Sequence, residues 1–334
     1  MIRSADLPHA PPGTSIFDDP VDELRHPELT IWRANVGAPV ALDLAPPGPA
    51  MVTGIDLLSW NVAAGAGRLR VLLERARRGE LAGAADDAGR PLVVLLQEAY
   101  RGDDTVPRGV HGRFHGGAIH PRIVDDVVEV ARAFGLSLRY APSMRNGAHA
   151  SDRGNAILST IPFSASHAFV LPYVRQRRVV VSAALAGVPG LALLSAHLDT
   201  GGQPRGGPRI GPFGAGRLAQ VRELLEHIHD PGEHSVIVGA DLNTPLGGRD
   251  PIVRALVSAG MRAAARVGTW RHTYHGPLPM VLDHVLFRSP DGRIARVRVH
   301  RIDERAGDIG WRVFGSDHHP LLARIDFREP VQRF

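Results

Sequence analysis

The sequence predicts a layered α/β domain whose sheets are at least partly antiparallel. Short apolar runs bounded by turn residues recur along the chain, and this pattern is typical of buried strands. Amphipathic segments with helical spacing separate some of these runs, whereas other runs follow one another with only a turn between them. Hairpin-length connections cannot join parallel neighbours, so the mixture favours helices layered on partly antiparallel sheets.

The apolar runs begin at Ile55 and are rich in the branched side chains that strands favour. In chain order they read IDLLSW, LVVLLQ, NAILST, RVVVSAAL, LALLSAHL, SVIVGADL, VLDHVLF and PLLARIDF. The amphipathic segments that predict helices are RLRVLLERARRGEL, PRIVDDVVEVARAFG, RLAQVRELLEHI and PIVRALVSAG. No internal repeat is visible in the sequence.

Residues 1–50 differ in character from the rest of the chain. They contain PHAPPG and APPGPA and show weak periodicity, which indicates a proline-rich N-terminal extension. Within this extension, IWRANVGAPVALDL can still pack on the core as a strand. We therefore expect an extension over residues 1–50 and one main domain over residues 51–334.

The composition is that of a folded protein with a sizeable core, since 44% of the 334 residues are hydrophobic. No run approaches the roughly 18 consecutive apolar residues of a membrane helix, and the N-terminus lacks a secretory-signal pattern, so a cytoplasmic location is the default expectation. Cysteine is absent, which excludes disulfides and thiolate metal sites. A bound metal would therefore have oxygen and imidazole ligands.

The formal net charge of +5 is carried by arginine, because the sequence contains no lysine. Arginine makes bidentate contacts with phosphate, so an anionic substrate fits this charge. A solvated basic surface explains the overall charge as well, and we favour that interpretation for the charge taken alone.

Two long unpatterned segments, residues 101–122 and 201–216, are candidate functional loops. A mobile surface loop is an equally good explanation for each of them. Histidines lie among the glycines of the first segment, at His111, His115 and His120. The arginines that could contact a phosphate backbone are Arg101, Arg108, Arg113, Arg122, Arg205 and Arg209.

Several apolar runs end in a side chain that can bind a metal or move a proton. Each of these residues has a structural explanation on its own, as a helix cap, an ion-pair partner or a strand-end acceptor. Strand ends at one rim are also how layered α/β proteins build a site from distant segments. The residues are Asn61, Glu98, His197, Asp241, Asn243, Asp283, Asp317 and His318.

The motifs around these residues resemble those of the endonuclease/exonuclease/phosphatase superfamily, which includes DNase I-like nucleases, apurinic endonucleases, sphingomyelinases and inositol-polyphosphate phosphatases. They occur in the family's order from about Ile55 to Phe327, and GADLNTP together with GSDHHP is the most specific combination. The matching segments are LLSWN (57–61), LLQE (95–98), RGNAILS (153–159), SAHLDT (195–200), VGADLNTP (238–245), LDHVLF (282–287) and GSDHHPL (315–321).

The resemblance implies a DNase I-like four-layered α/β sandwich, in which two packed mixed or antiparallel sheets are flanked by helices. Residues 51–334 would then be the catalytic domain. It also implies that Glu98 is the principal metal ligand, assisted by Asn61 and Asp317. Such an oxygen-rich shell suits Mg²⁺ or Mn²⁺. Ala63 stands where the apurinic endonuclease branch has a carboxylate, so we expect one ion.

The remaining roles also follow from the resemblance. Asp241 would orient or deprotonate the attacking water, and Asn243 would hydrogen-bond the phosphoryl oxygen. Asp283 would orient His318, which contacts the phosphate or transfers a proton. His197 matches a second histidine of the DNase I and sphingomyelinase branches, where it is a general acid or a phosphate binder.

Within RGNAILS, Asn155 and Arg153 are candidates for contact with the substrate phosphate. Stabilisation of a turn is an almost equally good explanation for Asn155. His284 and His319, which are neighbours of stronger candidates, are interpreted as structural.

The expected reaction is metal-dependent hydrolysis of a phosphodiester by in-line attack of an activated water. Nucleic acid is one candidate substrate, but aromatic residues make up only 5% of the chain and offer few stacking platforms. The alternative is a sphingomyelinase-like or phosphomonoesterase activity on a lipid or sugar phosphate. The short apolar segment FVLPYV (169–174) is the only candidate for a lipid-contacting hairpin.

Two interpretations outside phosphoester hydrolysis are weaker. A catalytically silent binding domain of the same fold would not need the retained catalytic side chains. A histidine-rich metal-binding protein is suggested by 17 histidines, yet these are scattered through loops without helical pairing. The sequence does not indicate an oligomeric state.

Overall fold

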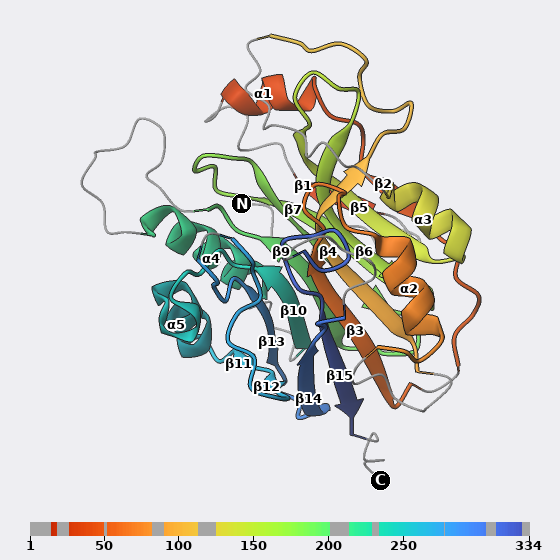
Figure 1. Cartoon of the computed structure of the whole chain (residues 1–334), viewed down its shortest axis with the longest axis vertical. Coiled ribbons are helices and arrows are strands. Elements are labelled where there is room, and N and C mark those ends of the chain that lie inside the picture. The colour runs from red at the N-terminus through yellow and green to blue at the C-terminus, as the bar shows by residue number, and fades with distance from the viewer. Residues whose placement is uncertain are drawn as a thin grey trace.

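The computed structural model describes residues 15–18, 27–49, 52–81, 90–112, 125–200, 214–228, 234–276, 278–304 and 312–328. These residues form two mixed β-sheets that pack face to face, with helices on the outer faces (Figure 1). None of the helices in these ranges is long and apolar enough to cross a membrane.

One sheet has eight strands and is antiparallel except for the β3–β4 and β12–β14 pairs. Its central strands carry the segments LLSWN and LLQE. In spatial order the strands are β12 (Ala265–Arg266), β14 (Ile294–Arg301), β15 (Leu321–Phe327), β3 (Gly54–Asn61), β4 (Leu92–Arg101), β6 (Asp152–Ser159), β5 (Ser137–Arg145) and β2 (Val40–Leu42).

The other sheet has seven strands, of which β9 and β10 are parallel neighbours and β1 is parallel to β7. In spatial order they are β1 (Ser15–Asp18), β7 (Phe163–Leu171), β8 (Arg178–Leu185), β9 (Leu191–His197), β10 (Ser235–Asp241), β13 (Asp283–Arg288) and β11 (Arg262–Ala263). Every apolar run singled out in the sequence forms a strand in one of the two sheets.

Apolar side chains from both sheets form the central core. Leu57 and Leu95 of the eight-stranded sheet share one buried cluster with Leu193 and Ile237 of the seven-stranded sheet. Burial of such side chains is the main favourable contribution to folding, at roughly 1.5–3 kcal/mol each. The alternation of inward and outward residues along the strands leaves a second apolar face on each sheet for the helices.

Two pairs of helices cover the outer faces. On the eight-stranded sheet lie α2 (Leu69–Arg77) and α3 (Val127–Phe134), which bury residues such as Leu72 and Val130 against it. On the seven-stranded sheet lie α4 (Ala215–Ile228) and α5 (Pro251–Ser258), which bury residues such as Leu224 and Leu256 against it. A short 3-10 helix, η2 (Gly247–Arg249), precedes α5. The four-layered α/β sandwich is therefore confirmed.

Local sequence explains where two of these helices begin. The side chain of Asp126 accepts hydrogen bonds from the backbone of Val128 and Glu129, so it caps α3 several residues later than the amphipathic pattern starts. Gly135 ends α3 in the left-handed conformation, with φ of 61°. Asp250 caps α5 and is followed by a proline at the first helical position.

The N-terminal segment contributes an edge strand to each sheet. β1 pairs with β7, and β2 pairs with β5. The segment IWRANVGAPVALDL begins in α1 (Pro27–Arg33) and reaches the sheet only as β2. The boundary at residue 50 stays a prediction.

Candidate active site

The candidate residues meet at one rim of the sandwich, where β3, β9 and β10 end and β13 begins. Strand register brings them together. Asp241 lies directly opposite Asp283 in the antiparallel β10–β13 pair and beside His197 in the parallel β9–β10 pair. His318 reaches the same place from the segment before β15, where its Nε2 lies 3.9 Å from Oδ2 of Asp241.

Asp241 is buried at the centre of this group. Its Oδ2 accepts a hydrogen bond of 2.9 Å from Nδ2 of Asn61, and its Oδ1 accepts one of 3.0 Å from the backbone N–H of Asn243. Burial raises the pKa of Asp241 to about 6, while the neighbouring His318 and the hydrogen bond from Asn61 oppose that rise. The carboxylate is thus ionised at neutral pH and close to the range in which a general base works well.

Asp283 and His318 form a carboxylate–imidazole pair. Nδ1 of His318 lies 2.8 Å from Oδ2 of Asp283, and both side chains are buried. Burial alone would lower the pKa of His318, but the charge and hydrogen bond of Asp283, together with the charge of Asp241, raise it to about 10. His318 is therefore an imidazolium at neutral pH, with its Nε2–H directed toward Asp241.

His197 is in the opposite protonation state. Nη1 of Arg178 donates a hydrogen bond of 3.0 Å to Nδ1 of His197. Burial, followed by the charge of Arg178, holds the pKa of His197 well below its usual range. Because guanidinium can only donate, Nδ1 carries the lone pair and Nε2 carries the proton. His197 is then a neutral N–H donor.

Asn243 places its amide beside this donor. Its Nδ2 donates to the carbonyl oxygen of Leu198 at 2.9 Å, which fixes the orientation of the amide, and lies 3.3 Å from Nε2 of His197. Asn243 also has φ of 51°, in the left-handed region that asparagine tolerates better than most residues. Two N–H groups thus converge on one small space next to Asp241, an arrangement suited to a phosphoryl oxygen.

Glu98 and Asp317 are the two predicted carboxylate ligands. Glu98 lies in a β-bulge of β4, between Leu96 and Ala99, and has φ of 55°. Strained backbone of this kind is typical of functional positions. Both carboxylates are half-buried, and no hydrogen bond or ion pair from the described residues occupies either one. Both charges influence their neighbours. The charge of Glu98 raises the pKa of Arg178, and the charge of Asp317 raises the pKa of His318.

Asn155 and Arg153 lie on β6. Nδ2 of Asn155 donates to the carbonyl oxygens of Val179 and Ser195, at 2.9 and 3.1 Å, and so joins the two sheets in the interior. Arg153 donates to Oδ1 of Asn146 at 3.3 Å, and its charge contributes to the low pKa of His197. Contact of either residue with substrate stays a prediction.

The sequence did not indicate Arg178, whose hydrogen bond determines the protonation state of His197. The available signal was the pair Arg177 and Arg178, of which Arg178 is the first residue of the strand RVVVSAAL. Asp199, which is fully buried, explains how this arginine is placed. Its Oδ2 accepts hydrogen bonds of 2.9 Å from the backbone N–H groups of Arg175 and Gln176, just before β8.

The arginines that the sequence suggested as phosphate contacts differ in their surroundings. Arg101 is fully buried and pairs with Asp152 at 2.5 Å, so its guanidinium supports the fold. Arg108 is exposed. The other arginines of the two candidate loops, and two of their histidines, lie outside the described residues, namely Arg113, Arg122, Arg205, Arg209, His115 and His120.

Comparison with known proteins places this geometry in context. The model of the Endonuclease/Exonuclease/phosphatase family matches residues 58–318, which include every candidate residue named above. No curated protein has significant sequence similarity to the chain.

Solved structures share the fold at low sequence identity. An endonuclease/exonuclease/phosphatase from Bacteroides vulgatus is 12% identical, with 83% of this chain and 100% of that chain covered and a TM-score of 0.55. The human Nocturnin catalytic domain with bound sulfate anion is 15% identical over 87% and 97%, with a TM-score of 0.52. D. rerio TDP2 complexed with single strand DNA product is 18% identical over 82% and 99%, with a TM-score of 0.51. At these identities the likeness shows the fold alone.

Proposed function

Because the chain belongs to the endonuclease/exonuclease/phosphatase family, we propose that it is a divalent-metal-dependent hydrolase of phosphodiester bonds, acting as a nuclease or general phosphodiesterase. One observation carries this proposal. An ionised Asp241 lies 3.4 Å from Nε2 of the neutral His197 and 3.9 Å from Nε2 of the protonated His318. A base and two different N–H donors are what water attack on a phosphodiester requires.

Three residues fit the metal that this family uses. Glu98 and Asp317 offer half-buried carboxylates without a protein partner among the described residues. Asn61 offers an amide oxygen, which accepts one hydrogen bond of 3.0 Å from the backbone N–H of Ala63 and has a second lone pair. This donor set consists of oxygen atoms, which Mg²⁺ and Mn²⁺ prefer. When bound, the ion would neutralise charge on the phosphate and polarise its oxygen. We assign one ion to these three residues.

The chain's own groups divide the proton transfers between them. Asp241, fixed by Asn61 and by the backbone of Asn243, accepts a proton from the attacking water. His318 donates a proton from Nε2 to the leaving oxygen, and Asp283 stabilises its positive charge through Nδ1. His197 and Asn243 donate hydrogen bonds to the phosphoryl oxygen as its charge increases.

A basic groove beside this group favours a substrate with further phosphates. It is lined by residues 245–249 and 279–281 and by Arg266 and Arg271. The first of these segments begins two residues after Asn243, and the second ends two residues before Asp283. With Arg249, three arginines line the groove, and arginine is a preferred partner of phosphate. The single strand DNA product in D. rerio TDP2 and the sulfate in human Nocturnin give independent support for anionic ligands on this fold.

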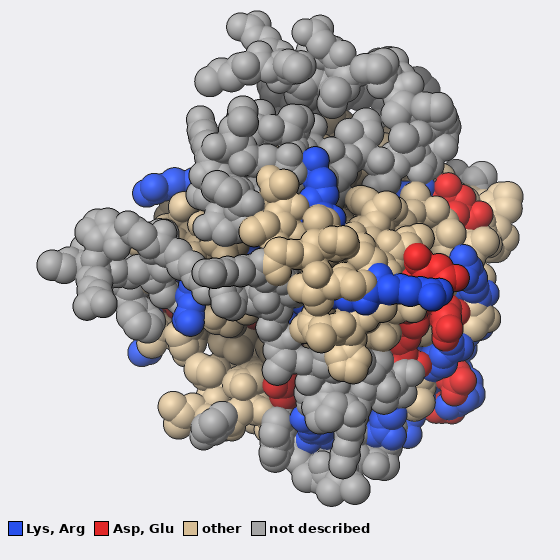
Figure 2. All heavy atoms as spheres, turned by 90° about the horizontal axis from the view of Figure 1, so that it is seen from above, with Lys and Arg blue, Asp and Glu red and all other residues tan. Residues whose placement is uncertain are grey.

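Overall charge contributes little to this proposal. Figure 2 views the molecule from the end opposite the arrowhead of β15. There most of the described acidic side chains lie among basic ones on the side of α2 and α3, and single basic side chains lie on the other side. Ion pairs such as Arg70 with Asp125, at 3.2 Å, lie between those two helices. The argument for an anionic substrate therefore rests on the arginines of the groove and on Arg178.

The segment FVLPYV gives no support to a lipid substrate. Phe169 and Leu171 are buried beneath α4 in the outer core of the seven-stranded sheet, and Val174 is also buried. An apolar hairpin that enters a membrane surface must be exposed. We therefore place the lipid phosphodiester activity second, together with hydrolysis of phosphomonoesters.

The test compares hydrolysis of plasmid DNA, RNA, sphingomyelin and bis-p-nitrophenyl phosphate, with Mg²⁺, with Mn²⁺ and with EDTA. We expect turnover of nucleic acid and of bis-p-nitrophenyl phosphate that requires the metal. In Asp241→Ala and His318→Ala the rate should fall by about 10²–10⁴-fold, which is the usual contribution of a general base or acid.

His284→Asn is the matched control for these variants. His284 is a buried neighbour of Asp283, but its Nε2 bonds Oγ1 of Thr244 at 2.8 Å, away from the proposed chemistry. Burial lowers its pKa to about 4. Full activity in Asp241→Ala and His318→Ala would exclude the mechanism, and failure to cleave any phosphoester would favour a catalytically silent binding domain.

A further inference from the structure

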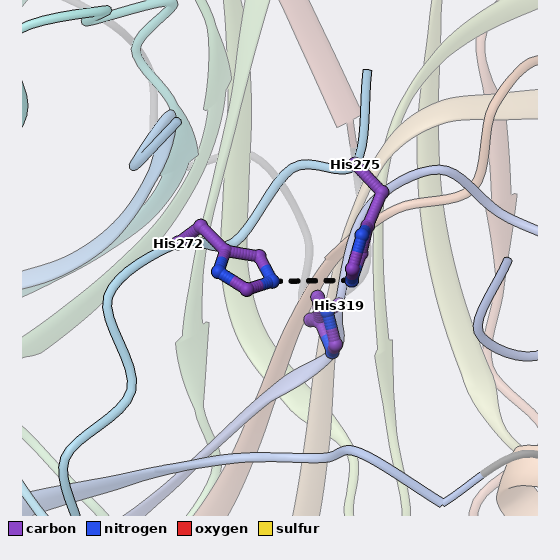
Figure 3. A group of neighbouring side chains, drawn as sticks. All are labelled: His272, His275 and His319. Carbon is purple, nitrogen blue, oxygen red and sulfur yellow. Dashed lines mark hydrogen bonds between the residues drawn. The ribbon is translucent and has the colours of Figure 1, made fainter. Parts of the chain in front are cut away.

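Three histidines that the proposed chemistry does not use converge on one point of the structure. They are His272 and His275, from the segment before β13, and His319, which directly follows His318 (Figure 3). One ring nitrogen from each lies within 4.8 Å of the others. We propose that His272, His275 and His319 form a second metal site, which binds a zinc-type transition-metal ion through imidazole nitrogens.

His319 has one nitrogen engaged and one available. Its Nδ1 lies 2.9 Å from the carbonyl oxygen of Ile302 and 3.0 Å from Oδ1 of Asp303, so Nδ1 carries the proton. Its Nε2 is buried and has no hydrogen-bond partner among the described residues. A buried polar atom without a partner is costly, unless a ligand satisfies it.

This arrangement is the one that metal-binding histidines adopt. Such residues almost always donate the other ring N–H to a carboxylate or to a backbone carbonyl, which orients the ring and increases the basicity of the ligating nitrogen. Nδ1 of His319 has both kinds of acceptor. Asp303 is itself fixed by Arg301, whose Nε lies 2.6 Å from Oδ1.

The spacing of His272 and His275 also suits a shared ion. Their Nε2 atoms face each other at 3.2 Å (Figure 3). Two nitrogens on a tetrahedral zinc ion, each about 2.0–2.1 Å from the metal, would be roughly 3.3 Å apart. These two ligands therefore need almost no movement, and the half-buried positions of both rings leave a fourth direction for water.

Backbone hydrogen bonds hold the three ligands in place before any ion binds. The N–H of His275 donates to the carbonyl oxygen of Asp317, and the N–H of His319 donates to that of Thr273, both at 2.7 Å. Nη1 of Arg301 donates to the carbonyl oxygen of His272, also at 2.7 Å. A site assembled in this way loses little conformational freedom on binding.

The ligand type distinguishes this second site from the proposed catalytic one. Imidazole nitrogens suit Zn²⁺, Cu²⁺ and Ni²⁺, whereas Mg²⁺ prefers oxygen. The segment that carries His272 and His275 also contacts the catalytic group. Oγ1 of Thr273 in this segment accepts hydrogen bonds of 3.0 Å from the backbone N–H groups of Leu282 and Asp283. The ring of Tyr274 lies 4.9 Å from that of His318. An ion on the three histidines would therefore brace the segment that supports Asp283 and His318.

The experiment measures Zn²⁺ binding to the full chain without an affinity tag, after removal of metals with a chelator. Excess Mg²⁺ is present throughout, so that the oxygen ligands of the catalytic group are occupied by the ion they prefer. Isothermal titration gives the stoichiometry and affinity, and Co²⁺ absorption in the visible range reports four-coordinate geometry. We expect one equivalent of Zn²⁺ and a melting temperature that rises with its concentration.

Variants separate this site from other histidines and from the catalytic group. His272→Gln and His275→Gln, on half-buried positions, should weaken Zn²⁺ binding by more than about 100-fold, and Asp303→Asn by about tenfold, as for loss of a partner of a ligating histidine. His234→Gln removes an exposed histidine at the other end of β10 and should bind Zn²⁺ like the unmodified chain. Glu98→Gln should also leave Zn²⁺ binding unchanged.

Two results would overturn the proposal. One is the absence of Zn²⁺ and Co²⁺ binding to the unmodified chain. The other is binding that His272→Gln and His275→Gln leave intact, which would assign the ion to different residues. Circular dichroism of each variant establishes that the fold persists, so a loss of binding reports the ligands themselves.

Discussion

Arg178 donates a hydrogen bond of 3.0 Å to Nδ1 of His197, and this contact determines which nitrogen of the imidazole carries the proton. His197 therefore differs from His318, although the Nε2 atoms of both lie within 4 Å of the same oxygen of Asp241. Environments that separate the pKa values of neighbouring groups are how an enzyme assigns them different roles.

The first prediction concerns Arg178→Met. Loss of the guanidinium removes the donor to Nδ1, so His197 should populate both neutral tautomers, and its pKa should rise, although burial still keeps it below the usual value. We expect kcat to fall by about 10²-fold, which is the lower end of the contribution of a positioned proton donor. Nitrogen-15 NMR of the His197 ring measures the tautomer directly.

Arg177→Met is the matched control for that variant. Arg177 precedes Arg178 but stacks on Trp32, with 3.2 Å between its guanidinium carbon and the ring centroid. Its loss should lower stability and leave the tautomer of His197 unchanged. An unchanged His197 spectrum in Arg178→Met would contradict the assigned role.

The second prediction concerns pH. Asp241 must be ionised to accept a proton, so activity should decrease as pH falls through about 6. His318 must be protonated to donate one, so activity should decrease as pH rises through about 10. The profile of kcat/KM should thus be a broad bell between those values.

Asp283→Asn tests the alkaline limb of that profile. The charge and hydrogen bond of Asp283 are the largest causes that raise the pKa of His318. Without them the alkaline limb should move toward the ordinary histidine pKa of about 6.5. The acid limb should also move, to lower pH, because the charge of Asp283 raises the pKa of Asp241. If the alkaline limb stays near 10, another group controls it.

The third prediction concerns Trp60→Phe. Nε1 of the fully buried Trp60 donates a hydrogen bond of 2.9 Å to the backbone carbonyl oxygen of His318. The substitution keeps an aromatic ring but leaves that carbonyl without its donor, which should cost about 1–3 kcal/mol of unfolding free energy. Chemical denaturation measures this loss, and kcat should fall because His318 is less well positioned.

Trp32→Phe provides the comparison for Trp60→Phe. Trp32 donates in the same way to the backbone carbonyl oxygen of Ser143, on β5. The Trp32→Phe variant should lose a similar amount of unfolding free energy but retain kcat under conditions in which the protein is folded. An equal loss of kcat in both variants would show that the effect of Trp60 is one of stability alone.

The fourth prediction concerns Gly154, in the segment RGNAILS. A Cβ at this position would lie 1.9 Å from the backbone oxygen of Ala141, on the neighbouring strand β5. Backbone cannot yield as a side chain does, so Gly154→Ala should destabilise the fold by about 1–3 kcal/mol or more. Gly109→Ala, where a Cβ meets nothing within 4 Å, should change stability by less than about 0.5 kcal/mol.

The sequence predicts the central strands and the four main helices because their apolar patterns are long and regular. It does not predict β5 or β14. In β5, Pro142 interrupts a strand whose register shifts between Pro142 and Met144. In β14, which has only the short β12 on its outer side, alternating arginines obscure the apolar residues Val297 and Val299.

The site was predictable where a motif joins a polar residue to a strand end, as at Asp241 and His318. The protonation states of the two histidines were not, because they depend on Arg178 and Asp283, which approach from other strands. The sequence also does not predict that His272, His275 and His319 lie together. Two members of this group lie on an irregular segment, and the third, His319, lies 44 positions after the second of them, His275.

The hydrogen bond between Asn61 and Asp241 joins side chains 180 residues apart, one from each sheet. β15, which follows His318, completes the eight-stranded sheet by inserting between β3 and β14. During synthesis β3 therefore emerges long before its antiparallel partner β15, and contacts of such large sequence separation make folding slow. A nascent chain that has not yet added β15 holds the proposed catalytic residues but lacks the strand that follows His318, so we expect activity only after β15 has paired with β3.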